Sequence, residues 1–324
     1  MTSPSSSTSS FSYGRYLAVC AIACACVVAA AMAASFVAIR HNLIQWHFGD
    51  LLDYQRAKIE APERIDILLV GDSSLGNGVD ARQWSQELGK RVVSVPLTGV
   101  YGLGGSLNMI KRAARRHRDI SAIVIMQTAD LMMRMPNRQG DLYTADRLSD
   151  IEDLRLLDLV PALANWDILS RTVARLVKAG AGIAADIRKA DYVPQGAPLS
   201  AAGKPPPRPS GSIRAIKPEN FIIARRIADE CRRLDVPCVY VHGPVFEAFC
   251  QSSAAYLQEV LDRMEQAGLR VIRSTVCLPW AEVGDSVDHV HPARKEAHSA
   301  AILAAVRPFI AGQAVKASSR PPMR

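Results

Sequence analysis

Two short segments of the sequence carry residue types that together can perform acyl transfer. Ser73 lies in a Gly-Asp-Ser-Ser stretch directly after an apolar run, and Asp288 and His291 lie three residues apart late in the sequence. A hydrolytic serine needs a base within hydrogen-bond reach and an acid that orients this base. In a tight turn, the Asp288 carboxylate can accept a bond from Nδ1–H of His291, which leaves Nε2 free to face Ser73. His289 has the wrong offset for this bond, and His298 falls on the helix that we expect next.

The elements that must position these residues alternate between strand and helix. Short, β-branched apolar runs predict buried strands at Ile65–Val70, Val92–Pro96, Ala122–Met126, Pro237–His242 and Leu269–Ile272. Helical patterns predict helices at 81–88, 104–117, 219–234, 254–267 and 292–309. This alternation predicts an α/β fold with a parallel sheet covered on both faces. Reactive groups in such sheets gather at the carboxyl ends of the strands. The polar or glycine residues that follow the predicted strands are Ser73, Gly99, Asp130, His242, Gly243, Asp288 and His291.

The order of these motifs resembles that of the SGNH, or GDSL-like, hydrolases. Their first motif carries the nucleophile, which maps onto Ser73, and their second supplies a glycine N–H to the oxyanion hole, which maps onto Gly99. Their last motif, an aspartate and a histidine three residues apart, maps onto Asp288 and His291. The resemblance implies a three-layer, flavodoxin-like parallel sheet, a Ser-His-Asp triad and no cofactor.

One motif of the family is changed in this sequence. The third motif, Gly-x-Asn-Asp, supplies an asparagine side chain to the oxyanion hole, but residues 127–130 read Gln-Thr-Ala-Asp. Ala129 has no donor, and the loss of one oxyanion donor typically slows an enzyme about 100- to 1000-fold. Gln127 and Asn77 are the candidates to replace this donor.

The N-terminal region carries targeting information. Residues 16–39 contain no charge and are long enough to cross a hydrocarbon core of roughly 30 Å. They form either an uncleaved signal anchor or a cleaved signal peptide, because Ala31-Met32-Ala33 resembles a cleavage site. We favour the anchor, since the apolar run is long and only Arg15 precedes it as a charge. Divergent relatives that resemble this chain in having such a segment often serve in O-acetylation of exported polysaccharides. The resemblance thus implies the bacterial inner membrane, with the domain facing the periplasm.

Charge excludes few classes of function. The formal net charge is +8, and much of it lies in Lys-Arg-Ala-Ala-Arg-Arg-His-Arg at 111–118. We interpret this segment as the solvated face of a helix; contact with an anionic polymer is the alternative. The sequence has no zinc-finger, RNA-binding or helix-turn-helix signature, which argues against nucleic acid as a partner. A metal site at His289, His291 and His298 is a weak alternative.

Seven cysteines divide between the apolar segment and the domain. Cys20, Cys24 and Cys26 lie in the apolar segment, where they act as small apolar fillers. The other four fit no zinc-site spacing and could form two disulfides in an exported domain. Among the possible pairs we prefer Cys250 with Cys277, because both are expected in loops after strands.

We divide the chain by these patterns. The segments are a polar tail 1–15, an anchor 16–39, a linker or helix 40–62, an α/β domain 63–312 and a tail 313–324. The domain contains an insertion at about 130–218, which ends in a Pro-rich loop at 194–212.

The leading hypothesis is a membrane-anchored serine esterase or O-acyltransferase that acts on an acetyl ester of an exported polysaccharide or glycan. The alternative is a catalytically degenerate protein that binds glycan or serves as a scaffold for a membrane acyltransferase. A nucleotide-binding domain is disfavoured, since residues 102–107 do not complete the glycine fingerprint of dinucleotide sites and the chain has no P-loop lysine.

Overall fold

The computed structural model describes residues 13–40, 47–151 and 216–311, together with five isolated positions between 163 and 177. The chain divides into two units, Met1–Gln45 with Asp153–Ala185 and Trp46–Glu152 with Asp186–Arg324. The Pro-rich loop predicted at 194–212 and the tail 313–324 lie outside the described residues.

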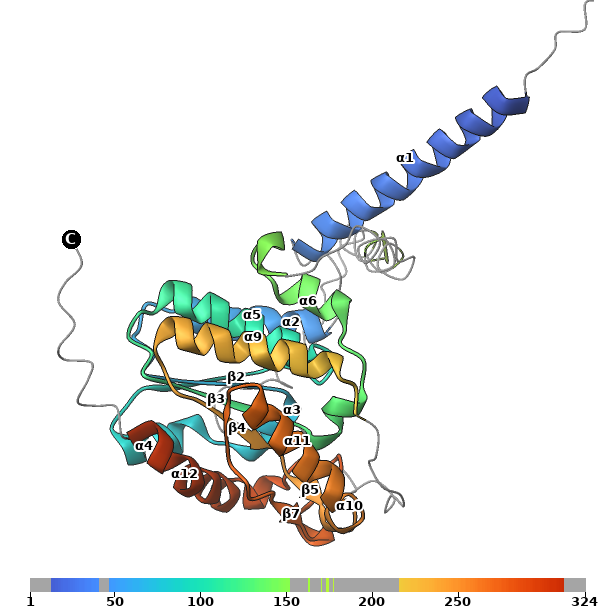
Figure 1. Cartoon of the computed structure of the whole chain (residues 1–324). Coiled ribbons are helices and arrows are strands. Elements are labelled where there is room, and N and C mark those ends of the chain that lie inside the picture. Colours follow the sequence, from blue (N-terminus) through green and yellow to red (C-terminus); the bar gives the residue numbers. More distant parts are fainter. Residues whose placement is uncertain are drawn as a thin grey trace, which may run out of the picture. The chain divides into compact units, whose positions relative to one another are not determined.

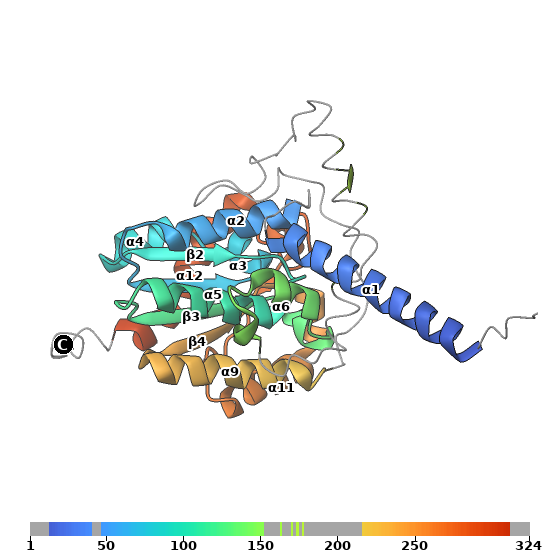
Figure 2. The same ribbon diagram turned by 90° about the horizontal axis from the view of Figure 1, so that it is seen from above.

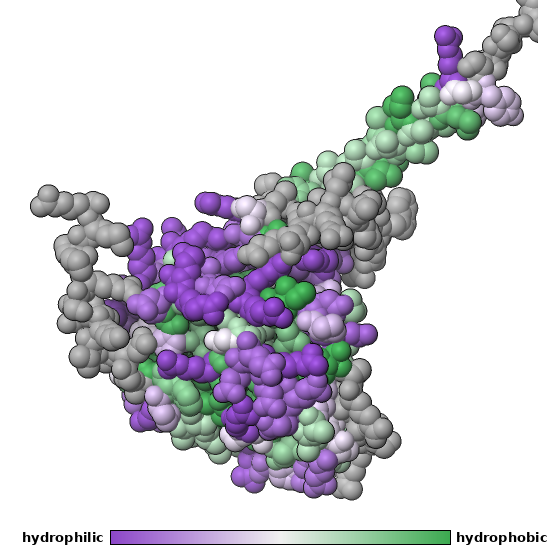
Figure 3. Space-filling model, in the orientation of Figure 1, coloured by the Kyte–Doolittle hydropathy of each residue, from purple (hydrophilic) through white to green (hydrophobic). Residues whose placement is uncertain are grey.

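Helix α1 spans Tyr13–Arg40 in the first unit. Its segment Tyr13–Ala38 has 26 residues and a mean hydropathy of 2.6. At about 1.5 Å per residue this length exceeds the roughly 30 Å of a hydrocarbon core. The exposed surface of this helix is coloured as hydrophobic along most of its length (Figure 3). The structure therefore contains, among its described residues, one helix that is long and apolar enough to cross a membrane.

The second unit contains a five-stranded parallel sheet in the order β2-β1-β3-β4-β6. The strands are β1 (Ile67–Gly71), β2 (Val92–Pro96), β3 (Ala122–Gln127), β4 (Cys238–His242) and β6 (Arg270–Val271). Strand β1 is central, and its last residue, Gly71, is in register with Pro96 and Met126. The chain leaves β1 toward β2 on one side and returns to β3 on the other. In doubly wound sheets ligands bind beside such a reversal of strand order.

Helices cover both faces of this sheet. Helices α2 (His47–Glu60), α5 (Gly102–Arg116) and α9 (Glu219–Leu234) lie side by side on one face (Figures 1 and 2). Helices α4 (Ala81–Leu88) and α12 (Lys295–Ala311) pack together on the other face. Helix α11 (Ala254–Gln266) contacts β6 and α9. The predicted parallel sheet with helices on both faces is confirmed.

The core forms between these layers because the central strands are apolar on both sides. Every residue of β1 and β3 is buried. On the α4–α12 face, Leu69 and Val124 pack in one cluster with Trp84 and Leu303. The indole Nε1 of Trp84 also donates to the carbonyl of Ser299 at 3.0 Å, which ties α4 to α12.

Some predicted boundaries match to the residue and others miss whole elements. The helices 81–88 and 219–234 and the strand 92–96 are confirmed. The start of α4 can be predicted from the sequence because Asp80 is a favourable N-cap residue, and its carboxylate accepts the N–H groups of Arg82 and Gln83. The segment 40–62, expected as a linker or helix, contains α2, which packs on β2 and α5.

The first part of the predicted insertion at 130–218 packs on the domain. It contains the 3₁₀ helices η1 (Ala129–Met133) and η2 (Leu148–Asp150), with helix α6 (Arg138–Thr144) between them. The side chain of Asn108 in α5 donates to the Thr144 hydroxyl in α6 at 2.9 Å. This contact anchors α6 to α5.

A second, two-stranded sheet was not predicted. It pairs β5 (Val245–Phe246) with β7 (Cys277–Leu278), and helix α10 (Glu247–Ser252) follows β5. The preferred disulfide Cys250–Cys277 is confirmed, and Cys231–Cys238 forms the other bridge. Cys250 lies in α10 and Cys277 in β7, so our placement of both in loops was wrong. The prediction missed β5 and β7 because two-residue strands leave almost no periodic pattern.

Three arginines of the basic segment 111–118 form ion pairs within the fold. Arg112 and Arg116 pair with Glu60 of α2, and Arg112 and Arg115 pair with Asp146. Arg115 also pairs with Asp150 at 3.0 Å. These contacts clamp α5 to its neighbours, which favours the helix-surface interpretation over contact with an anionic polymer.

Candidate active site

The turn after β1 is held by one buried carboxylate. Asp72 precedes helix α3 (Ser73–Gly78), and its Oδ1 accepts the N–H of Ser74 at 3.0 Å and the hydroxyl of Ser74 at 2.6 Å. Its Oδ2 accepts the N–H of Thr128, just past β3, at 2.8 Å. One side chain therefore joins the ends of β1 and β3, on either side of the point where the strand order reverses.

Gly71 is required because β3 passes so close. A Cβ at Gly71 would lie 1.9 Å from the carbonyl oxygen of Met126, which is backbone and cannot swing aside. The absence of a side chain at this glycine thus allows the turn after β1 to pack directly against the backbone of β3.

Ser73 is less buried than its two neighbours in this turn. It is the first residue of α3 and is half-buried, while Asp72 and Ser74 are buried. Within the part of the chain that the structure describes, the Ser73 hydroxyl has no hydrogen-bond partner, whereas the Ser74 hydroxyl is bound to Asp72. The Asn77 amide donates to the carbonyl of Ser73 at 2.9 Å and fixes its backbone. The turn therefore presents one free serine hydroxyl at the carboxyl end of the central strand.

The electrostatics of Asp72 link the turn to the C-terminal loop. Burial, the bonds from Ser74 and Thr128 and the charge of Asp288 together set the pKa of Asp72 at about 6: burial and Asp288 raise it, and the two bonded residues lower it. The segments also lie close together, since Cγ2 of Val290 is 3.8 Å from the ideal Cβ position of Gly78, the last residue of α3. The structure thus brings the segments that carry the first and last predicted motifs to one region.

The loop with Asp288 and His291 rests on the small second sheet. The Cys250–Cys277 disulfide joins α10, which follows β5, to β7, and the N–H of Phe246 in β5 donates to the carbonyl of Val287 at 2.9 Å. Val283 forms an antiparallel bridge with Val290, and the N–H of His291 donates to the carbonyl of Glu282 at 2.7 Å. The backbone of this loop is therefore well defined.

The side chains of Asp288 and His291 do not make the bond that we expected. Nδ1 of His291 accepts the N–H of Ala293 at 3.2 Å, and Asp288 accepts the hydroxyl of Ser286. Because Nδ1 acts as an acceptor, a neutral imidazole carries its proton on Nε2. That tautomer cannot take a proton from Ser73, and no hydrogen bond joins Ser73 to His291 among the described residues.

His289 has the opposite arrangement. Its Nδ1 lies 2.8 Å from Oδ1 of Asp285, so Nδ1 carries the proton, and its Nε2 lies 3.9 Å from Oδ1 of Asp288. Burial lowers the pKa of His289, but the bond to Asp285 and the charges of Asp288, Asp285 and Asp72 raise it above its ordinary value. Sequence offset excluded His289 as the partner of Asp288; it did not reveal that Asp285, four residues earlier, reaches this ring.

The two candidate replacement donors are engaged elsewhere. Gln127 is fully buried, and its Nε2 donates to the hydroxyl of Ser106 in α5 at 2.7 Å. The Asn77 amide serves the carbonyl of Ser73. Ala129 is buried, and its carbonyl accepts the Tyr256 hydroxyl at 2.6 Å. Among the described residues, none of these three forms a side-chain hydrogen bond to the Ser73 hydroxyl.

Gly99 faces a cation that the sequence reasoning missed. Residues 98–101 form a turn closed by the N–H of Tyr101 on the carbonyl of Thr98 at 3.0 Å. A Cβ at Gly99 would lie 2.8 Å from Nη1 of Arg134, so the guanidinium lies against this residue. Arg134 also pairs with Asp130 at 2.5 Å. No local motif marks Arg134, because its position depends on how the segment after β3 folds back over the sheet edge.

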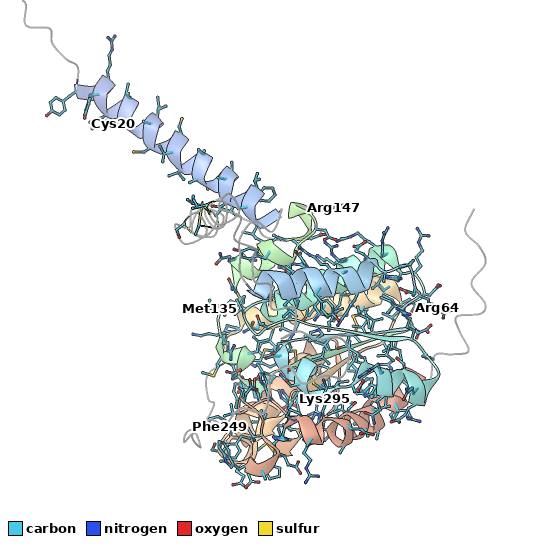
Figure 4. The ribbon with its side chains drawn as sticks, turned by 180° about the vertical axis from the view of Figure 1, so that it is seen from behind. Cys20, Arg64, Met135, Arg147, Phe249 and Lys295 are labelled. Atoms are coloured by element: carbon cyan, nitrogen blue, oxygen red, sulfur yellow. A yellow bond between two sulfur atoms is a disulfide. The ribbon has the colours of Figure 1, made fainter. Side chains whose placement is uncertain are left out.

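Two other histidines contact backbone carbonyls and join elements of the fold. Burial lowers the pKa of His242 to about 4, and its Nε2 lies 3.2 Å from the carbonyl of Leu257. Nδ1 of His298 lies 2.8 Å from the carbonyl of Gly78. Nearby, Nζ of Lys295 in α12 donates to the carbonyl of Gly76 in α3 at 2.6 Å (Figure 4). These contacts join α12 to α3 and do not involve Ser73.

Comparison of the chain with models of known protein families finds no match, and comparison with curated proteins finds none either.

Proposed function

We propose that the protein is a serine esterase or O-acyltransferase in which Ser73 is the nucleophile. The observation that carries this proposal is the turn after β1, where Asp72 and Ser74 are buried and bound while the Ser73 hydroxyl is free at the carboxyl end of the central strand. The carboxyl ends of strands in such sheets are the usual place for reactive groups. The resemblance of the motifs to SGNH hydrolases supports the same assignment.

In the proposed mechanism the Ser73 Oγ attacks an ester carbonyl and its proton passes to a histidine. We assign this base to His291 and its orienting acid to Asp288. The structure sets two conditions. The imidazole must turn so that Nδ1 leaves the N–H of Ala293 and faces Asp288, and its proton must move from Nε2 to Nδ1, which frees Nε2 for Ser73. The histidine then protonates the departing alkoxide, and the acyl group remains on Ser73 until water or a sugar hydroxyl accepts it.

His289 is the competing base. Its Nδ1 already faces a carboxylate, Asp285, so its Nε2 is the free nitrogen of the neutral ring. Substitution of each histidine in turn distinguishes the two assignments.

The membrane context supports a glycan substrate outside the cytoplasm. Helix α1 can cross a bilayer, and two disulfides in the domain are typical of oxidising compartments. We therefore propose a single-pass protein of a bacterial inner membrane, with the domain on the periplasmic side. An acetylated exported polysaccharide is the proposed substrate, and a membrane acyltransferase the proposed partner.

The test is covalent labelling of the intact protein with a fluorophosphonate. We expect a single adduct, mapped to Ser73 by peptide mass spectrometry, and no adduct in Ser73→Ala. Ser252→Ala is the control, because this exposed serine lies in α10, where its hydroxyl bonds to the carbonyl of Ala248. A folded wild-type protein that does not react would contradict the proposal.

A second candidate function is glycan binding or scaffolding without turnover. It is favoured by one observation: Ala129 has no side-chain donor where the family places its asparagine, and the amides of Gln127 and Asn77 donate to Ser106 and to the Ser73 carbonyl. Polysaccharide binding that survives Ser73→Ala, together with no hydrolysis of any acetyl ester, would support this function over the first.

A further inference from the structure

The missing oxyanion donor has a structural counterpart in the segment that follows β3. The chain turns through η1 and places Arg134 next to the loop that carries Gly99. The backbone of Arg134 is held on both sides, since its N–H donates to the carbonyl of Leu131 at 3.0 Å and its carbonyl accepts the buried amide of Asn220 at 2.9 Å. The backbone of Arg134 is therefore held in place beside the candidate site.

The side chain of Arg134 extends toward the predicted oxyanion hole. Its Nη1 occupies the space that a side chain at Gly99 would fill, 2.8 Å from the ideal Cβ position. Its Nη2 donates to Oδ2 of Asp130 at 2.5 Å. The guanidinium is thus held between the ends of β2 and β3. The neighbouring residue Met135 lies at the margin of the domain beside η1 and is 59% exposed (Figure 4).

The loop that carries Gly99 begins beside the turn with Ser73, since the N–H of Leu97 donates to the carbonyl of Gly71 at 2.8 Å, so Arg134 lies near the reacting end of the sheet. Burial lowers the pKa of Arg134, but the bond to Asp130 and the charges of Asp130, Asp72 and Asp288 raise it above its ordinary value. Asp72 adjoins the nucleophile, and Asp288 is the proposed orienting acid. A cation whose charge acts on both carboxylates is well placed to meet negative charge that develops at Ser73.

We propose that Arg134 supplies the oxyanion donor that the chain lacks at Ala129. When the Ser73 oxygen bonds to the ester carbon, the carbonyl π bond opens and its electron pair becomes the oxyanion. Nη1–H of Arg134 then donates to this oxygen beside the N–H of Gly99. Collapse of the intermediate restores the carbonyl and expels the alkoxide, which takes its proton from the histidine. Asp130 is a positioning residue, because it holds the guanidinium in this orientation. The assignment rests on the proposed function.

A competing explanation is that Arg134 and Asp130 form only a surface ion pair. Such i,i+4 pairs contribute little to stability, and their loss leaves catalysis unchanged. The chain offers a matched control: Arg263 pairs with Glu259 at i,i+4 and 2.6 Å, and its side chain is 40% exposed, compared with 47% for Arg134. Arg263 lies in α11, away from the carboxyl ends of β1 and β2.

The experiment measures steady-state hydrolysis of p-nitrophenyl acetate by the full chain. We expect Arg134→Gln to lower kcat on the order of 100-fold with little change in KM, because the interaction forms only in the transition state. Arg134→Lys should recover part of this loss, and Arg263→Gln should match the wild type. A kcat within about twofold of wild type in Arg134→Gln would overturn the assignment.

A double-mutant cycle separates the effect of displacing the Arg134 guanidinium from general destabilisation of the protein. Gly99→Ala should fold, since its new methyl group meets the movable end of Arg134, but it should displace the guanidinium and lower kcat. In the Arg134→Gln background the same change should have little further effect, so the two losses should not add. Full additivity would overturn the proposal. Absence of any Ser73-dependent turnover in wild type would overturn the proposed function as well, which distinguishes the two failures.

Discussion

The turn that carries Ser73 and the loop that carries His291 are held in different ways. The turn, residues 71–77, follows directly from the central strand of the main sheet, and the buried carboxylate of Asp72 accepts bonds from Ser74 and Thr128. The loop, residues 283–292, rests on a two-residue strand pair and a disulfide. Its backbone is paired, but the ring of His291 bonds to Ala293 and not to Asp288. The proposed nucleophile is thus held by buried neighbours, Asp72 and Ser74, while the proposed base requires a side-chain rotation.

This difference has a physical reason. Backbone positions at the end of a central strand are fixed by ladder bonds on both sides, so a residue one position further has little freedom. Side chains on a surface loop have several rotamers of similar energy, and a resting enzyme need not hold the catalytic bond. The comparison predicts large effects of backbone changes in the turn and large effects of side-chain changes in the loop.

The largest expected effect is on catalysis, through the loop histidines. We expect His291→Gln to lower kcat for p-nitrophenyl acetate about 1000-fold or more, as loss of a base that activates serine does. His289→Gln is the matched variant two residues away and should retain most of the activity. The reverse result would assign the base to the Asp285–His289 pair and would remove the need for the rotation of His291.

The next effect is on stability, through one glycine in each region. Gly71→Ala should cost about 3 kcal/mol or more of unfolding free energy, because its Cβ would meet backbone of β3 at 1.9 Å. Gly284→Ala should cost about 1 kcal/mol, because the nearest loop carbonyl, of Val290, lies at 3.2 Å and can shift. Urea denaturation of both variants measures the difference. Equal costs would contradict the view that the turn is the more rigid region.

The same difference explains what the sequence predicts well. The strand 92–96 is a continuous buried apolar run, and the helices 81–88 and 219–234 are amphipathic and packed on the core, so local pattern and tertiary structure agree. Gly71, Asp72 and Ser73 follow from the end of an apolar strand. The β5–β7 sheet, the Asp285–His289 pair and the contact of Arg134 with Gly99 could not be predicted. Each depends on how loops that lack a repeat fold back on the domain.

Removal of the Cys250–Cys277 bridge should destabilise the loop with His291 more than the turn with Ser73. The double change Cys250→Ser and Cys277→Ser should cost about 2–4 kcal/mol, since the bridge closes a 27-residue separation. It should also lower kcat, because β5 and β7 support the loop. The Cys231–Cys238 bridge closes only seven residues, so its removal should cost less and should leave kcat unchanged. Melting temperatures and kcat of both variants test this; an equal loss of kcat in both would contradict a selective role.

The smallest expected effect is a dependence of loop stability on pH. The pKa of His289 is raised in the folded protein, so the bond to Asp285 contributes stability that is full below about pH 6.5 and is lost as the pH rises through the raised pKa. Asp285→Asn should therefore destabilise the protein by about 1 kcal/mol or less at pH 6 and by almost nothing at pH 9. Urea denaturation at the two pH values measures this. Burial raises the pKa of Asp72 to about 6, so its protonated form favours the folded state, and this contribution is lost as the pH rises from about 4 to 6. The two windows are separate, and a loss in Asp285→Asn that stayed equal at pH 6 and pH 9 would show that the loop is not held by the charged form of His289.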